Sequence, residues 1–139
     1  MRPLLNLIWV LFGGFWLFLE YMVVGLIACI PIVTIPVAVA CWRIGGYVLW
    51  PFGRVVVHKP GAGAGSVLMN IVWFFIAGIW LAIGHLVTAL VMTVTIIGIP
   101  LALANLKLIP VTCFPFGKMV VSVEEARWRG YTPVGAVSV

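Results

Sequence analysis

Three polar residues, Glu20, His85 and Asn105, lie inside long apolar stretches of this sequence of 139 residues. A carboxylate at membrane depth is costly and indicates a functional site. In a homo-oligomer, a ring of Glu20 side chains at an outer mouth would concentrate cations. Glu20 also lies about 24 Å along a helix from Leu4, close to an outer interface where it would simply contact water or headgroups. Both interpretations stay open, as does an interfacial place for His85. Glu20, His85 and Asn105 are the candidate pore or ion-interacting residues.

Two basic residues, Arg43 and Lys107, each precede a Pro-Phe-Gly tripeptide by about two helical turns. Long basic side chains near the end of a membrane helix extend toward the lipid headgroups. The alternative is an inward-facing pair that binds anionic lipid or another anion. Asn105, two residues before Lys107, adds a polar neighbour in the second half of the chain only. Arg43 and Lys107 are therefore the candidate lipid- or anion-binding residues.

Sequence signatures of catalysis are absent. The chain has no Gly-rich phosphate loop, no His-Glu-x-x-His motif and no nucleophile elbow. Its three cysteines have no Cys-x-x-Cys spacing, which argues against a zinc site or a disulfide framework. We expect a protein that is not an enzyme and that uses no metal and no cofactor.

The composition places the chain in a membrane. Apolar residues make up 65% of it and charged residues 8%, whereas an average soluble domain is about one quarter charged. So few charges cannot cover the apolar surface, which excludes soluble enzymes, disordered chains and secreted disulfide scaffolds. The net charge of +5 comes from bases scattered between apolar runs, as in topology-setting charge. We therefore expect no nucleic-acid binding.

An internal repeat organises the chain. Asn6 aligns with Asn70 at an offset of 64 residues, and the alignment continues without a gap to two Pro-Phe-Gly tripeptides at 51–53 and 115–117. Asn and Trp residues spaced by three and by seven lie on one face of a helix. This pattern favours a helix-packing seam, and a pore or groove lining is the alternative. The seam residues are Asn6, Trp9, Trp16, Asn70, Trp73 and Trp80.

Each half is long enough for two membrane segments, since a spanning helix needs about 20 residues. The second segment of each half contains a helix break, at Pro36 or at Pro100, because proline removes a backbone donor. A helix from Pro36 to Leu49 would measure only about 21 Å. This segment is therefore either completed by extended residues or re-entrant.

The predicted fold is all-α and integral to the membrane. It has four membrane segments in two tandem two-segment repeats of the same orientation, with a short cytoplasmic β-strand after each Pro-Phe-Gly turn. The turns around 29–33 and 93–97 carry no Lys or Arg, so the positive-inside rule places both termini in the cytoplasm. The expected divisions are a first repeat (1–58), a flexible linker (59–66), a second repeat (67–122) and a cytoplasmic tail (123–139).

The duplicated motifs resemble those of a known family. They are an Asn-x-x-Trp entry, an Ile-x-(Gly/Thr)-Ile-Pro-x-Ala-x-Ala break and a (Trp/Phe)-Pro-Phe-Gly-(Arg/Lys)-x-Val-Val exit. This pattern is similar to that of the YccF family of bacterial inner membrane proteins, from about Leu4 to Glu125. The resemblance implies one or more copies of a domain with two membrane segments. It also implies a multi-pass protein of the bacterial inner (cytoplasmic) membrane, and adds no enzymatic activity.

Four segments are few for a monomer with a central path, so we expect a homo-oligomer. The favoured function is a homo-oligomeric pore or channel for ions or small solutes. One alternative is a non-catalytic structural or regulatory membrane component that binds partners or anionic lipid. A further alternative is a small coupled transporter that uses Glu20. The expected partners are membrane lipids and further copies of the chain.

Overall fold

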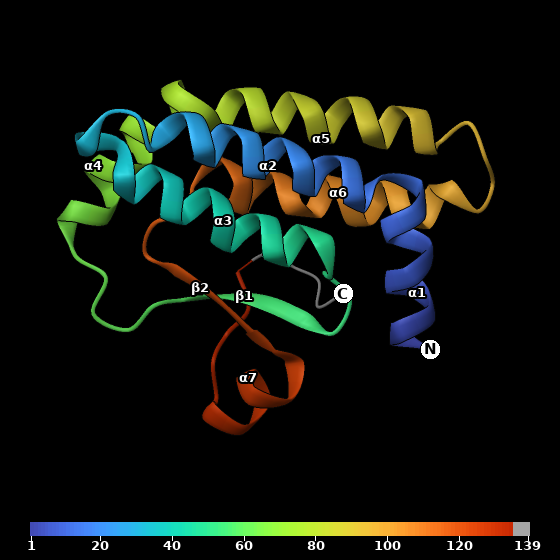
Figure 1. Cartoon of the computed structure of the whole chain (residues 1–139). Helices are drawn as coiled ribbons and strands as arrows, with labels where there is room; N and C mark the ends of the chain where they lie inside the picture. Colours follow the sequence, from blue (N-terminus) through green and yellow to red (C-terminus); the bar gives the residue numbers. More distant parts are fainter. Residues whose placement is uncertain (135–139) are drawn as a thin grey trace.

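The computed structural model describes residues 1–134, in which two halves of the chain repeat nearly the same order of elements (Figure 1). The first half consists of α1 (Arg2–Trp9), a π-helical segment (Val10–Gly14), α2 (Phe15–Ala28), a 3-10 turn (Ile32–Thr34), α3 (Ile35–Leu49) and β1 (Arg54–His58). The second half consists of α4 (Ala64–Trp73), a π-helical segment (Phe74–Gly78), α5 (Ile79–Met92), α6 (Gly98–Cys113) and β2 (Lys118–Ser122), and α7 (Val123–Arg129) follows. The last residues of the expected tail, 135–139, lie outside the described residues.

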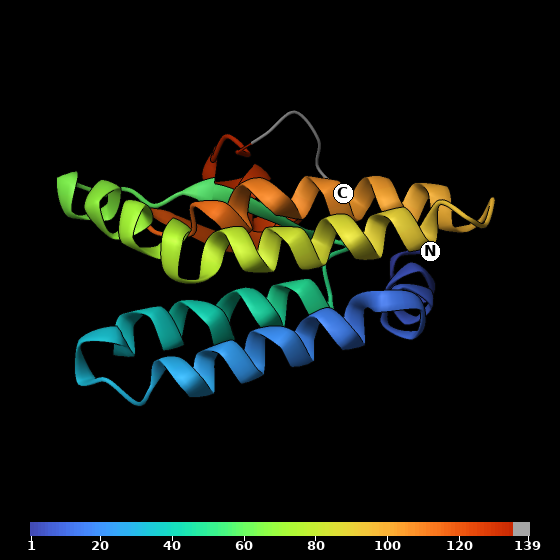
Figure 2. The ribbon, with the colours of Figure 1, turned by 90° about the horizontal axis from the view of Figure 1, so that it is seen from above.

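The long helices form two hairpins that lie side by side, α2 with α3 and α5 with α6 (Figure 2). In Figure 1, α2 and α5 form an upper layer, α3 and α6 lie beneath them, and the two strands and α7 form the lower side. The apolar core fills the space between the layers and includes both tryptophans of the Asn-x-x-Trp motifs, Trp9 and Trp73. The fold is thus mostly helical and carries one small sheet.

The two hairpins run antiparallel to each other. A Cβ on Gly13, just before α2, would touch Met92 and Thr88 near the end of α5, and a Cβ on Gly84 would touch Glu20. The turns that precede α3 and α6 therefore lie at opposite ends of the helical layers (Figure 1). Hairpins that crossed a membrane along their axes would cross it in opposite directions. This differs from the common orientation expected from the sequence, because the placement of charges reports a shared face and not the direction of a helix.

A pseudo-twofold axis relates the two halves. Tyr21 and His85, which are 64 residues apart, touch across the interface between α2 and α5. Val56 and Val120 share this offset and face each other in the antiparallel pair of β1 and β2. Equivalent residues meet each other only on a symmetry axis. The axis therefore passes through both pairs and runs perpendicular to the antiparallel helices.

The strands expected after the two Pro-Phe-Gly turns are confirmed, and they pair with each other. Helix α7 begins at an N-cap serine, to which the Glu125 N–H donates at Ser122 Oγ, 3.0 Å away. It ends at Gly130, whose left-handed backbone favours glycine. Helix α4 begins at Ala64, so it includes the last residues of the segment expected as a flexible linker (59–66).

Within residues 1–134, three helical stretches are long and apolar enough to cross a membrane by length and composition, namely Arg2–Ala28, Ile32–Leu49 and Ala64–Met92. The first is not straight, because α1 turns away from α2 at the π-helical segment and is seen end-on in Figure 2. The helices α2, α3, α5 and α6 have 14, 15, 14 and 16 residues, or about 21–24 Å each. Pro36 and Pro100 stand in the first turns of α3 and α6, where they mark the start of each helix.

Candidate functional site

The first half closes on itself through one asparagine and one tryptophan of α1. Asn6 Nδ2 donates to the Phe52 carbonyl oxygen at 3.0 Å, and the Phe52 N–H donates back to Asn6 Oδ1 at 3.0 Å. Trp9 Nε1 donates to the Val48 carbonyl oxygen at 2.7 Å, in the last turn of α3. We call this arrangement the Asn–Trp clamp. It fixes the Pro-Phe-Gly turn against the start of the chain.

The second half contains the same clamp. Asn70 exchanges two hydrogen bonds with the backbone of Phe116, at 3.0 and 2.9 Å. Trp73 Nε1 donates to the Thr112 carbonyl oxygen at 2.6 Å. The Asn and Trp residues of the predicted seam therefore bind the exit turn of their own half, which explains why the entry and exit motifs are duplicated together.

The other two seam residues face outward. Trp16 and Trp80 are 68% and 64% exposed, respectively, on the upper layer. Between the two tryptophans of each half lies a glycine, Gly14 or Gly78, at which a Cβ would overlap the indole of the clamp tryptophan. The predicted seam is thus divided into an inner clamp and an outer aromatic surface.

A buried polar cluster marks the pseudo-twofold axis. Tyr21 Oη lies 3.0 Å from His85 Nε2 and 2.6 Å from Thr112 Oγ1. His85 Nδ1 is hydrogen-bonded to Asn105 Oδ1, and Thr112 Oγ1 lies 2.9 Å from the Leu108 carbonyl oxygen. The side chains of Tyr21, His85, Asn105 and Thr112 are fully buried. The cluster joins α2 of the first half to α5 and α6 of the second.

The direction of donation in this cluster follows from the groups present. Asn105 Oδ1 only accepts, so His85 donates from Nδ1 and accepts at Nε2 from the Tyr21 hydroxyl. Asn105 Nδ2 is buried and has no hydrogen-bond partner among residues 1–134. His85 therefore contacts the first half through Tyr21, Asn105 binds His85 within the second half, and both side chains are enclosed by protein.

Two members of this cluster, Tyr21 and Thr112, were not among the predicted site residues. Tyr21 aligns with His85 at the repeat offset, and this pairing of two polar residues was the available signal. Thr112 aligns with Val48, so it gives no signal that both halves share. Its role depends on packing across the axis, which the sequence does not show.

Glu20 lies between α2 and α5, one residue from the axis. It is half-buried against Gly84, the equivalent residue of the second half, where a Cβ would meet the carboxylate. The two ion pairs found within residues 1–134 involve other residues. Glu20 is therefore in the middle of the upper layer, and the missing side chain of Gly84 provides the space for its carboxylate.

Two shallow crevices on the lower side bring together basic residues from different halves. Arg43 of α3 and Lys118 of β2 line the first basic crevice, and Lys107 of α6 and Arg54 of β1 line the second. Arg43 aligns with Lys107 and Lys118 with Arg54, so the pseudo-twofold axis exchanges the two crevices. Arg43 Nη2 also donates to the Pro115 carbonyl oxygen at 3.3 Å. Each crevice therefore depends on both repeats.

The first basic crevice adjoins an apolar groove. This groove has a volume of about 360 Å³ and is lined by Arg43 together with Ile35, Pro36, Val39, Ala40 and Phe116. Burial lowers the pKa of the Lys118 ammonium group, which lies 5.9 Å from the centre of the Phe114 ring. A partly desolvated cation is favoured by an approaching anion. Arg43 thus stands where a polar crevice and an apolar groove meet.

The described chain shows no convergence of catalytic groups. Residues 1–134 contain no group of three His, Cys, Asp or Glu side chains placed to bind a metal ion, and Cys29, Cys41 and Cys113 are free. A groove of about 330 Å³ between the halves is lined by apolar residues and one threonine, without a titratable side chain. The two basic crevices, in contrast, combine charged side chains from both repeats.

Two segments of the chain, residues 4–54 and 68–118, match the YccF inner membrane component domain. The chain belongs to the YccF family. It is 33% identical over 136 residues to inner membrane protein YccF of Escherichia coli (strain K12). The alignment covers 91% of this chain and 92% of the relative. Inner membrane protein YccF of Shigella flexneri matches with the same identity and coverage. No solved structure matches the chain.

Membership of the YccF family confirms the resemblance expected from the duplicated motifs. Each matched segment contains one complete Asn–Trp clamp, which gives the YccF motif a structural explanation. The family description names an inner membrane component and no reaction. The chain is therefore a membrane protein with two copies of this domain.

Proposed function

We propose that this YccF protein is a non-catalytic component of the inner membrane that binds anionic phospholipid on its lower side. The first basic crevice carries this proposal, because Arg43 lines it together with Lys118 and also lines the apolar groove along α3. A phospholipid requires both features, since its phosphate needs cations and its acyl chains need apolar surface.

The dimensions of the two hollows suit different parts of a lipid. The first crevice holds only about 10 Å³, so a phosphate group sits at its mouth against Arg43 and Lys118. The adjoining groove of about 360 Å³ accommodates part of an acyl chain. A guanidinium group offers two parallel N–H donors to a phosphate, which favours Arg43 as the principal contact.

The channel and the coupled transporter suggested by the sequence have weaker support. The channel requires a water path and the transporter uses Glu20, whose carboxylate lies half-buried between α2 and α5, against Gly84. His85 and Asn105 are enclosed in the axial cluster. By contrast, Arg43 and Lys107 occupy equivalent crevices on the lower side, as a lipid-binding component requires. The basic residues of the lower side also favour a cytoplasmic location for this side by the positive-inside rule.

Native mass spectrometry of the detergent-solubilised full chain tests lipid binding. Wild-type protein should retain phosphatidylglycerol in preference to phosphatidylcholine. Each base near an anionic headgroup contributes about 1 kcal/mol, so Arg43→Gln should weaken retention about fivefold and the double variant with Lys118→Gln about thirtyfold. Lys59→Gln removes the same charge outside the crevices and should have little effect.

Two results would overturn the proposal. Equal retention of the two lipids by the wild-type protein excludes a specific anionic site. A loss of binding in Lys59→Gln as large as that in Arg43→Gln shows only a diffuse charge effect.

A further inference from the structure

We propose that the two helical layers lie along one leaflet of the membrane, with the pseudo-twofold axis parallel to the membrane normal. In this pose the lower side, which consists of β1, β2 and α7, lies at the aqueous boundary, and α2 and α5 are the most deeply embedded helices. This pose sets how deeply each element of the molecule is immersed in the bilayer, in addition to the headgroup sites in the crevices.

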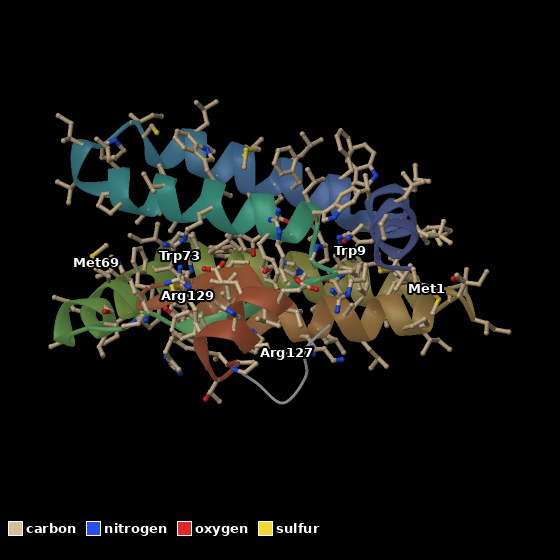
Figure 3. All side chains as sticks on the ribbon, turned by 90° about the horizontal axis from the view of Figure 1, so that it is seen from below. Met1, Trp9, Met69, Trp73, Arg127 and Arg129 are labelled. Carbon is tan, nitrogen blue, oxygen red and sulfur yellow. The ribbon has the colours of Figure 1, made fainter. Side chains whose placement is uncertain are left out.

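The first observation is the distribution of charge. All eight lysines and arginines lie on the lower side or reach it. Arg2 is ion-paired with Glu124 of α7, and Arg43 and Lys107 line the basic crevices. Figure 3 shows this side from below, with Arg127 and Arg129 labelled on α7. The remaining bases are Arg54, Lys59 and Lys118, in or directly after the strands. The upper layer contains one charged residue, Glu20.

The second observation concerns the two interhelical turns. Val33 in the turn before α3 and Val94 in the turn before α6 are 88% and 85% exposed. Their neighbours Ile30, Ile32 and Ile96 are similarly exposed, and neither turn contains a charged residue. These turns lie at opposite ends of the molecule (Figure 1). Two apolar tips at opposite ends fit a hydrocarbon environment at both ends, which an orientation along the membrane provides.

The third observation is the place of the sheet. Val56, at the centre of β1, packs against the apolar core beside α3 and α6, and the strands lie below these helices along their length (Figure 1). If the helices crossed the bilayer, the strands with Arg54 and Lys118 would lie near mid-depth, where charged side chains are strongly disfavoured. With the axis along the normal, the same residues lie at the headgroups.

The lengths of the helices agree with this pose. Between the π-helical segments and the turns, the individual helices have 14 to 16 residues and measure about 21–24 Å, whereas the hydrocarbon core is about 30 Å thick. The exposed outer tryptophans, Trp16 and Trp80, then contact acyl chains.

Spin-label depth measurements on the full chain in phosphatidylcholine vesicles test the pose. Single labels are placed at Val33→Cys and Val94→Cys in the two turns and at Lys59→Cys on the lower side, with the native cysteines replaced. Both turn labels should be several-fold more accessible to oxygen, relative to a water-soluble nickel chelate, than the label at residue 59. The native Cys29, which borders the first turn, provides the same measurement without replacing the buried cysteines.

Contact of either turn label with the nickel chelate overturns the proposal. Labelling of the two turns by an impermeant maleimide from opposite sides of the vesicle would show hairpins that cross in opposite directions. Labelling of both turns from the side opposite residue 59 would show the common orientation expected from the sequence. Because the vesicles are zwitterionic, the result does not depend on selective binding of anionic lipid.

Discussion

Replacing Asn6 with alanine is expected to be among the most destabilising changes in α1. The Asn6 side chain is 1% exposed and satisfies both the N–H and the carbonyl oxygen of Phe52. A buried polar group left without a partner costs about 1–3 kcal/mol, so the loss of two such partners should reduce the free energy of unfolding by about 2–6 kcal/mol. Asn70→Ala should cost less, because Asn70 is only partly buried, whereas Asn6 is buried.

Denaturant titration in detergent micelles, followed by far-UV circular dichroism, measures this effect. The free energy of unfolding is obtained by linear extrapolation for the wild type, both asparagine variants and Val67→Ala, a control on the exposed face of α4. The clamp interpretation is wrong if Asn6→Ala stays within about 0.5 kcal/mol of the control, which is the usual range for a surface substitution.

Three further predictions concern the turns, the axis and the lower side. Gly98→Ala places a Cβ against the backbone carbonyl of the last residue of α5 and should cost about 1–3 kcal/mol, whereas Gly46→Ala, which meets no neighbour, should be neutral or slightly stabilising in thermal melts. Tyr21→Phe removes the hydroxyl that joins the axial cluster and should lower the free energy of unfolding by about 1–3 kcal/mol. A hydrogen bond to its own backbone N–H, together with Arg2, lowers the pKa of Glu124. The stabilisation that the ionised Glu124 carboxylate provides is therefore present above the ordinary carboxyl pKa, and it is lost as the pH falls through the lowered pKa. Spin-label distances between α1 and α7 should lengthen on acidification, and Glu124→Gln should remove this dependence.

The repeat offset predicted which residues act together, because identical motifs in one chain make identical contacts. It paired Asn6 with Asn70 and Trp9 with Trp73, and the structure shows the same two hydrogen-bonding patterns in both halves. Local signals were sufficient for the strands, because a run of β-branched residues follows each Pro-Phe-Gly turn.

The arrangement of the two halves in space was not predictable by the same means. Apolar periodicity identifies a helix and its buried face but not the direction in which it passes a neighbour. The axial pair escaped detection because its members differ, and Asn105 and Thr112 occur in one half only. In sequence spacing, Trp16 and Trp80 share one helical face with the clamp residues of their halves. A π-helical segment lies between each of them and its clamp residues, and there the chain changes direction.

The contact between Tyr21 and His85 has an evolutionary consequence. In a dimer of identical single-domain chains, a residue on the twofold axis always meets its own copy, so a tyrosine opposite a histidine is impossible there. Fusion of two copies into one chain allows each position to mutate separately. The cluster around His85, which includes Asn105 where the other half has Cys41, is therefore a product of divergence after duplication. A single-copy ancestor that dimerised in this geometry would have needed a self-complementary residue at its centre.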